Sequence, residues 1–273
     1  MLGHVEWVTF ARVDAVPPVG GIAHATETWE GAAGGGAVAA LQLAKLAGSC
    51  DLFTALGDDE LGRRARVELE GNGVTVYAAT RDDPTRKAIC LVDGDGERTI
   101  TTLGARLETD GVDRLPWGAL READGVYVTA GDADAIREAR AARVLVVSLR
   151  HLDMLARSEV RPDAVVGSAR DPAERYDRAA LAHAPPRLVV LTEGAAGGTF
   201  QTEGGRPGRF EPAPIPGPIV DTYGSGDSFH AGLTFGLATG LSDDEAIALA
   251  ARCGAAALTG HGPAGGQLTA GER

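Results

Sequence analysis

The sequence predicts an α/β protein that forms a single domain, with parallel strands and one inserted β-hairpin. In the second half of the chain, short apolar runs alternate with segments of helical periodicity, which is typical of parallel strands joined by crossovers. Residues 87–103 contain two β-type runs joined by Asp-Gly-Asp-Gly, a strong hairpin signal. The length of 273 residues suffices for one large domain, and no linker-like segment divides it. We therefore expect one α/β domain whose hairpin could form a small β lid.

The first half of the chain predicts two strands and two helices. Residues 5–10 (VEWVTF) are rich in strand formers, and a polar stretch with prolines and glycines follows them. Residues 34–48 carry small and aliphatic side chains at helical spacing. Residues 52–58 predict a buried strand that ends in acids, and residues 60–74 then predict an amphipathic helix closed by glycines.

The second half predicts further strands and helices in alternation. Apolar runs predict strands within residues 142–149, 163–168 and 186–194. Helices are expected within residues 171–183, 228–240 and 241–258. The last of these begins with Ser242 and Glu245 at the spacing of a capping box.

Composition excludes several classes of partner. The net charge of −12 argues against a surface that follows nucleic acid or an anionic membrane. No apolar run approaches the roughly 20 residues that span a bilayer, and no signal peptide is evident, so we expect a cytoplasmic protein. Cys50, Cys90 and Cys253 are widely spread and lack metal-ligand spacing, which predicts buried free thiols in a reducing compartment.

A glycine-rich turn precedes the helix expected from residue 228. Its glycines, Gly224 and Gly226, allow several backbone N–H groups to point into one concavity, and a helix N-terminus adds partial positive charge. Such a nest binds anions, including a phosphoryl group in transfer. Asp227, directly behind it, could accept a proton from an attacking hydroxyl. The alternative is that Asp227 only caps the helix.

Five segments in order resemble one enzyme family. Residues 221–229 (DTYGSGDSF) closely resemble the C-terminal signature of the ribokinase-like (PfkB) carbohydrate kinases. Residues 34–48 resemble the N-terminal Gly-Gly motif and its helix, and residues 55–74 resemble the segment that follows. Residues 93–101 are similar to the lid hairpin, and residues 189–198 to the nucleotide-binding strand and turn. Together these matches span nearly the whole chain.

The resemblance implies a ribokinase-like three-layer α/β/α domain over residues 1–273, with a small β-sheet lid from approximately residues 10–30 and 85–104. It also implies an ATP-dependent kinase that uses Mg²⁺, with K⁺ in many members, and phosphorylates a hydroxyl of a sugar or nucleoside. Lid-mediated dimers are common in the family, so a homodimer is one expectation.

Individual roles follow from matching positions. Asp227 is expected to be the base that deprotonates the acceptor hydroxyl, and Gly224, Ser225 and Gly226 to form the anion hole. The nucleotide side is expected at Thr192, Gly194, Gly197, Ser168, His261 and Gly262. Asp221 and the Tyr223 carbonyl match a monovalent cation site, and Asp171 matches the Mg²⁺ shell.

The sequence departs from the family pattern at three places. Val38 stands where a sugar-binding Asn is usual. The usual Asp-x-Asn-x-Arg strand reads VVSLR, which keeps only Arg150. The Asn-x-x-Glu motif reads Ser168-Ala-Arg-Asp171, where a water could bridge to the metal. We therefore expect intact chemistry at Asp227 and unusual acceptor recognition.

The acceptor side is expected at Glu6, Gly35, Gly36 and Arg150. The alternatives are that Glu6 faces outward from its strand and that the glycines only start a helix. Three cations of the lid region could reach an anionic substrate, although a solvated face is expected for them: Arg86, Lys87 and Arg98.

Two other functions remain open. Gly34, Gly36 and Ala39 fit G-x-G-x-x-A, which raises an NAD(P)-dependent Rossmann oxidoreductase, but residues 26–33 are polar and do not supply the preceding hydrophobic strand. The altered acceptor and Mg²⁺ positions also suit a catalytically retired ligand-binding protein. The intact Asp227 and its glycines argue against that second alternative.

Overall fold

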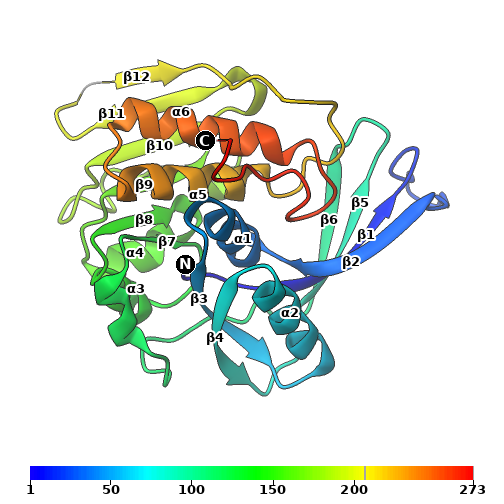
Figure 1. Cartoon of the computed structure of the whole chain (residues 1–273), viewed down its shortest axis with the longest axis horizontal. Coiled ribbons are helices and arrows are strands. Elements are labelled where there is room, and N and C mark those ends of the chain that lie inside the picture. Colours follow the sequence, from blue (N-terminus) through cyan, green and yellow to red (C-terminus); the bar gives the residue numbers. More distant parts are fainter. Residues whose placement is uncertain (206, 273) are drawn as a thin grey trace.

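The computed structural model describes residues 1–205 and 207–272 and consists of a central sheet between helical layers, with a smaller sheet at one side (Figure 1). Part of the central sheet has the strand order β12-β11-β10-β9-β8-β7. Its parallel strands are β7 (Gly125–Val128), β8 (Val144–Ser148), β9 (Ala164–Ser168) and β10 (Leu188–Thr192). Its antiparallel edge is β11 (Gly198–Thr202) and β12 (Pro207–Phe210). Leu2 bridges β7 to β3 (Cys50–Gly57), which pairs in parallel with β4 (Val74–Arg81).

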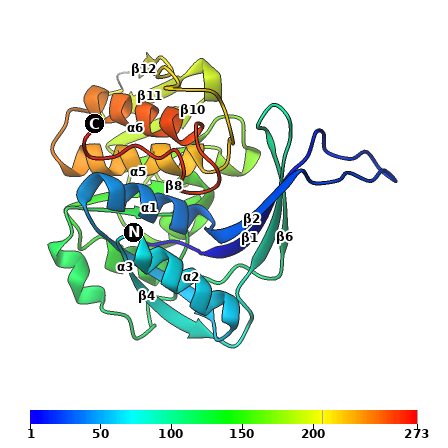
Figure 2. The same ribbon diagram turned by 45° about the vertical axis from the view of Figure 1, so that its right-hand side comes forward.

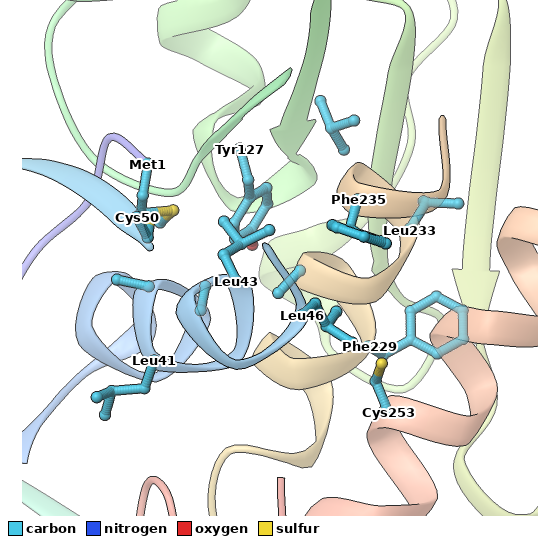
Figure 3. Packing of buried hydrophobic residues seen from close by; sticks show 14 of the residues in the cluster. Met1, Leu41, Leu43, Leu46, Cys50, Tyr127, Phe229, Leu233, Phe235 and Cys253 are labelled. Carbon is cyan, nitrogen blue, oxygen red and sulfur yellow. The ribbon is translucent and has the colours of Figure 1, made fainter. Parts of the chain in front are cut away.

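Strand alternation gives the central sheet two cores. Val144 and Val146 of β8 belong to the core beneath helices α1 (Gly35–Ala47), α5 (Ser225–Ala238) and α6 (Asp243–Ala257). Figure 3 shows this core, to which Leu43 of α1, Phe235 of α5 and Cys253 of α6 contribute. Leu145 and Val147 belong to the opposite core, with α3 (Ala133–Ala139) and α4 (Leu152–Ser158). The expected three-layer α/β/α arrangement is confirmed.

The smaller sheet, here called the lid, has the strand order β2-β1-β5-β6 and extends from the body of the protein (Figure 2). Its strands are β1 (Glu6–Arg12), β2 (Glu27–Ala33), β5 (Lys87–Val92) and β6 (Arg98–Leu103). Phe10, Cys90 and Val92 share a buried cluster on one face of the lid. The edge strand β6 is exposed along its length. The dimer expected from the family resemblance stays a prediction.

Several predictions of local structure are confirmed. Helix α2 (Glu60–Gly71) and the β5–β6 hairpin form where expected. Ser242 and Glu245 make the capping box of α6. The cysteines Cys50, Cys90 and Cys253 are buried and free. Among the residues that the structure describes, no helix is long and apolar enough to cross a membrane. The remaining short helices are η1 (Trp117–Glu122), η2 (Leu149–His151), η3 (Pro172–Glu174) and η4 (Gly194–Ala196).

One prediction of local structure was wrong. Residues 171–183 contain only the short helix η3 and turns, because the Glu174 side chain turns inward and accepts the Ser168 N–H at 2.7 Å. Residues 26–33 include β2, whose polar first residues are exposed, so this segment does not supply a hydrophobic strand, as expected. Strand β2 runs antiparallel to β1 in the lid, which is not the buried parallel strand that a Rossmann site requires.

Helix α1 begins in direct contact with the chain that leads into β1. The Gly36 N–H donates to the His4 carbonyl at 3.0 Å. A Cβ atom on Gly36 would lie 2.5 Å from both the Gly3 carbonyl carbon and the His4 oxygen. Because both neighbours are backbone atoms, the absence of a side chain at residue 36 sets how closely the helix approaches the lid strand. Gly36 thus has a packing role.

We expect Gly36→Ala to lower the free energy of unfolding by about 1–3 kcal/mol, since the added methyl group overlaps the backbone of residues 3–4, which can move only at a cost in energy. Gly71→Ala is the matched control, because nothing lies within 4 Å of a Cβ at the end of α2. The control should leave stability unchanged or raise it by less than about 1 kcal/mol. Urea denaturation measures both, and equal stability of the two variants would contradict this packing role.

Candidate active site

A cleft of about 660 Å³ opens between the lid and the carboxyl ends of the parallel strands. Ligands of open α/β sheets bind at these strand ends. Its wall includes the last residues of three strands, Ser148, Ser168 and Thr192. The residues predicted from the sequence that line it are Glu6, Gly35, Arg150, Ser168, Asp171, Thr192, Tyr223, Gly224, Gly226 and Asp227. The fold therefore brings residues that the sequence predicts for catalysis, for the acceptor and for the nucleotide into one space.

Asp227 is the third residue of α5 and presents a carboxylate to this cleft. The N-cap of the helix is Gly224, and no side chain caps it. Among the described residues, no donor lies within hydrogen-bonding distance of the Asp227 carboxylate. Burial raises its pKa to about 6, partly offset by the positive charge of Arg98. The helix-cap alternative is therefore not what the geometry shows.

The turn before α5 is an open nest of amide groups. Gly224 has φ 77°, a left-handed conformation that suits glycine. The backbone N–H groups of Ser225, Gly226 and Asp227 find no acceptor in residues 1–205 and 207–272, as expected for the first turn of a helix without a cap. Val38 packs beneath the turn, with Cγ1 2.8 Å from where a Gly224 Cβ would lie. Val38 thus replaces a polar contact by apolar support.

The lid is joined to the same turn by hydrogen bonds. Arg98 Nη1 of β6 donates to the Thr222 carbonyl at 2.7 Å, and the Thr222 N–H donates to the Gly96 carbonyl at 3.0 Å. Arg12 Nη2 of β1 donates to the Val220 carbonyl at 2.9 Å. Arg98 is exposed, as expected for a solvated lid face, and it also lines one side of the cleft. Lys87 is exposed as expected.

The acceptor side of the cleft holds an acid and a neutral histidine. Glu6 is 6% exposed and pairs with Arg86 at 3.1 Å, so neither the outward-facing Glu6 nor the solvated Arg86 is observed. His4 Nε2 accepts the Gly35 N–H at 3.4 Å, and burial lowers the His4 pKa to about 3. A Cβ on Gly35 would lie 2.9 Å from Asp227 Oδ1, so only glycine leaves this approach open. No sequence pattern predicted a role for His4.

A charged cluster forms the opposite wall. Arg150 donates to Glu174 Oε1 through Nε at 3.1 Å and Nη2 at 2.7 Å, and it also pairs with Asp171. Glu174 is 8% exposed. Glu174 is not among the residues predicted from the sequence, although an acid three residues after Asp171 repeats the spacing of the expected motif. Arg150 therefore lies in the cleft with its guanidinium already paired.

The other predicted residues are not among those that line the cleft. Gly194 and Gly197 form the turn after β10, which the Glu193 N–H closes onto the Gly197 carbonyl at 2.7 Å. The His261 ring stands edge-on to lid Trp29, with centroids 5.1 Å apart. The Asp221 carboxylate is fully buried and accepts the Tyr223 N–H at 2.8 Å and the Gly262 N–H at 3.0 Å. Their roles toward nucleotide and cation stay predictions.

The described residues contain no metal site built from several protein side chains. Within the part of the chain that the structure describes, no group of three or more His, Cys, Asp or Glu side chains could hold a metal ion. The donors present fit a Mg²⁺ ion held by phosphates and water, the usual mode where this ion accompanies a nucleotide. Ser168 and Asp171 line the cleft where they would contact that water shell.

Comparison with known proteins agrees with this geometry. A family model described as pfkB family carbohydrate kinase matches residues 2–270. The chain is 31% identical over 289 residues to the ATP-dependent ribose-1-phosphate kinase of Halopiger xanaduensis, covering 93% of this chain and 89% of that protein. It is 29% identical over 260 residues to the aminoimidazole riboside kinase of Salmonella typhimurium, covering 81% and 79% respectively.

The fold likeness extends to a solved structure. Ribokinase from Thermotoga maritima aligns with a TM-score of 0.76 at 18% identity, covering 99% of this chain and 95% of that one. At that identity the likeness establishes the fold alone, whereas the family model spans nearly the whole sequence. The chain belongs to the pfkB family of carbohydrate kinases.

Proposed function

We propose that the protein transfers the γ-phosphoryl group of ATP to a hydroxyl of a ribose-type acceptor, with Asp227 as the general base. The observation that carries this proposal is the Asp227 carboxylate, which faces the cleft without a protein donor and adjoins the unpaired N–H groups of the 224–227 turn. The acceptor class is suggested by the two relatives, one named for ribose 1-phosphate and one for a riboside. Free sugar, sugar phosphate and nucleoside are therefore the first acceptors to compare.

Different residues of the cleft have different roles in the proposed phosphoryl transfer. Asp227 takes the hydroxyl proton as that oxygen forms its bond to phosphorus, a contribution of roughly 10²–10⁴ in rate. The N–H groups of Ser225, Gly226 and Asp227 receive the charge that spreads over the phosphoryl oxygens. Mg²⁺, when bound to the phosphates, neutralises part of their charge. Glu6 and His4 hold acceptor hydroxyls, and the lid excludes water.

The direct test is acceptor-dependent ADP release from Mg-ATP, with K⁺ present, across sugars, sugar phosphates, sugar acids and nucleosides. The proposal predicts release with at least one ribose-type acceptor. If no acceptor causes ADP release while ATP still binds, the proposed kinase activity is contradicted, and a ligand-binding protein without catalytic activity is favoured.

Asp227→Asn should lower kcat by about 10²–10⁴ while ATP binding stays within about twofold, because the substitution removes a base and leaves the nest. The variant should also be at least as stable as wild type at pH 8. The folded pKa lies above its unfolded value of about 4, so wild type loses stability as the pH rises from about 4 to about 6, and this loss is fully present at pH 8.

Asp153→Asn, at an exposed position in the first turn of α4, is the matched control for Asp227→Asn. Kinetics, calorimetric ATP titration and thermal melts measure the effects. Retained turnover in Asp227→Asn would refute the base assignment.

The acid limb of the pH–rate profile should report the same group. A base must be deprotonated, so kcat/KM of wild type should fall tenfold per pH unit below about pH 6. Arg98 lowers the Asp227 pKa by its charge, so Arg98→Gln should move this limb to higher pH. Lys87→Gln, at an exposed position of the lid, is the control. An unmoved limb in Arg98→Gln would contradict the proposed coupling.

We further propose that Asp221 and the Tyr223 carbonyl form a K⁺ site. Asp221 is 0% exposed, and among the described residues no Lys, Arg or His lies within ion-pair distance of it. Buried carboxylates are ordinarily paired or bound to a cation. Its two backbone donors, from Tyr223 and Gly262, leave further lone pairs free.

This K⁺ proposal predicts ion-specific effects at constant ionic strength. Replacing choline chloride by KCl should raise both the melting temperature and kcat of wild type, because an ion that binds only the folded state stabilises it. Asp221→Asn should lose both responses. Equal melting temperatures of wild type in K⁺ and choline would contradict the site, whether or not the variant folds.

A further inference from the structure

Arg170 places a guanidinium group in the cleft, between β9 and the nucleotide-side turn. Its own backbone N–H donates to Ser168 Oγ at 3.2 Å, which fixes the chain after β9. The guanidinium lies against Gly194, with Nη1 2.9 Å and Cζ 3.2 Å from where a Gly194 Cβ would stand. Because Gly194 has no side chain, the Arg170 head group reaches the turn directly.

The Arg170 guanidinium is exposed and has no carboxylate within ion-pair distance among the described residues, unlike Arg150 and Arg209, which are paired. Glu193, the acid beside Gly194, is paired with Arg209 through Nη2 and Oε2 at 2.7 Å. Asp171, the next residue in sequence, is paired with Arg150. In a protein with a net charge of −12, a cation left unpaired in a cleft is available to an anionic ligand.

The acids of this segment are already engaged. Asp171 Oδ1 accepts the Ala173 N–H at 2.9 Å, while its other oxygen pairs with Arg150. Glu174 accepts Arg150 through one oxygen and the Ser168 N–H through the other. Asp171 and Glu174 therefore have few oxygen lone pairs left to bind a Mg²⁺ ion. A Mg²⁺ ion held through these acids would neutralise less of the negative charge on the phosphates. A free guanidinium in the same segment can supply that charge directly.

We propose that Arg170 donates hydrogen bonds to the terminal phosphate of ATP and stabilises it during transfer. This inference rests on the proposed phosphoryl transfer. In that step the acceptor oxygen bonds to the γ-phosphorus, the bond from that phosphorus to the bridging oxygen of ADP breaks, and Asp227 receives the acceptor proton. Arg170 forms no covalent bond and remains protonated throughout. Its planar fork matches two phosphate oxygens at once.

Arg170→Gln tests the assignment, because it removes the charge and breaks no side-chain hydrogen bond or ion pair among the described residues. We expect kcat/KM for ATP to fall about 10²–10³-fold, the size seen when one donor to a developing anion is lost. Without acceptor, calorimetry should show ATP binding weakened at least about tenfold and ADP binding changed less than about threefold, since ADP lacks the γ-phosphate. The KM for the acceptor should stay unchanged, and Arg170→Lys should recover part of the rate.

Arg178→Gln is the matched control, since Arg178 is exposed, lies outside the cleft wall and loses the same charge. It should behave as wild type in binding and rate. Arg170→Gln with the ATP affinity of this control would overturn the inference, as would equal weakening of ATP and ADP. Should wild type still show acceptor-dependent ADP release that Asp227→Asn abolishes, only the Arg170 assignment fails and the proposed function stands.

Discussion

The Asp227 carboxylate occupies a cleft that removes much of its water and offers it no hydrogen-bond donor among the described residues. That placement is unfavourable for an ionised group and is maintained by the packing around it. Helix α5 is buried over most of its length against α1 and α6, so its first turn cannot rotate the acid away. Gly35 leaves room for a ligand atom beside Oδ1, where any side chain would intrude. Packing of the core thus keeps the Asp227 carboxylate at a position that is unfavourable for an ionised side chain.

The environment of this acid combines charges from separate parts of the chain. Arg98 comes from the lid, Glu6 from the first lid strand and Glu174 from the segment after β9, and each shifts the Asp227 pKa. Because Arg98 also binds the Thr222 carbonyl, lid position and the charge near the base are linked. A lid that opens would withdraw a cation and admit water together. In the proposed transfer, protection of the phosphoryl group and the pKa of the base would therefore depend on the same contact between the lid and residue 222.

Local sequence chemistry predicted the features that depend on neighbouring residues. The Asp-Gly turn of the hairpin, the capping box of α6 and the nest before α5 each follow from a few adjacent side chains. His4 carries no local signal and Glu174 carries only its spacing from Asp171, because their contacts come from Gly35 and Arg150, residues distant in sequence. Residues 171–183, expected to be helical, form a short helix and turns instead. The sequence predicts Gly36 on the acceptor side, whereas the structure places it against the backbone of residues 3–4.

Burial by the fold raises the pKa of Asp227, and no hydrogen-bond donor among the described residues counteracts it. A carbon-detected NMR titration of the Asp227 carboxyl in the unliganded protein measures this most directly, with the Asp227→Asn spectrum identifying the resonance. We expect a midpoint near 6, since burial raises the pKa to about that value. A midpoint near the ordinary aspartate value of about 3.9 would show a solvated carboxylate and contradict this role of burial.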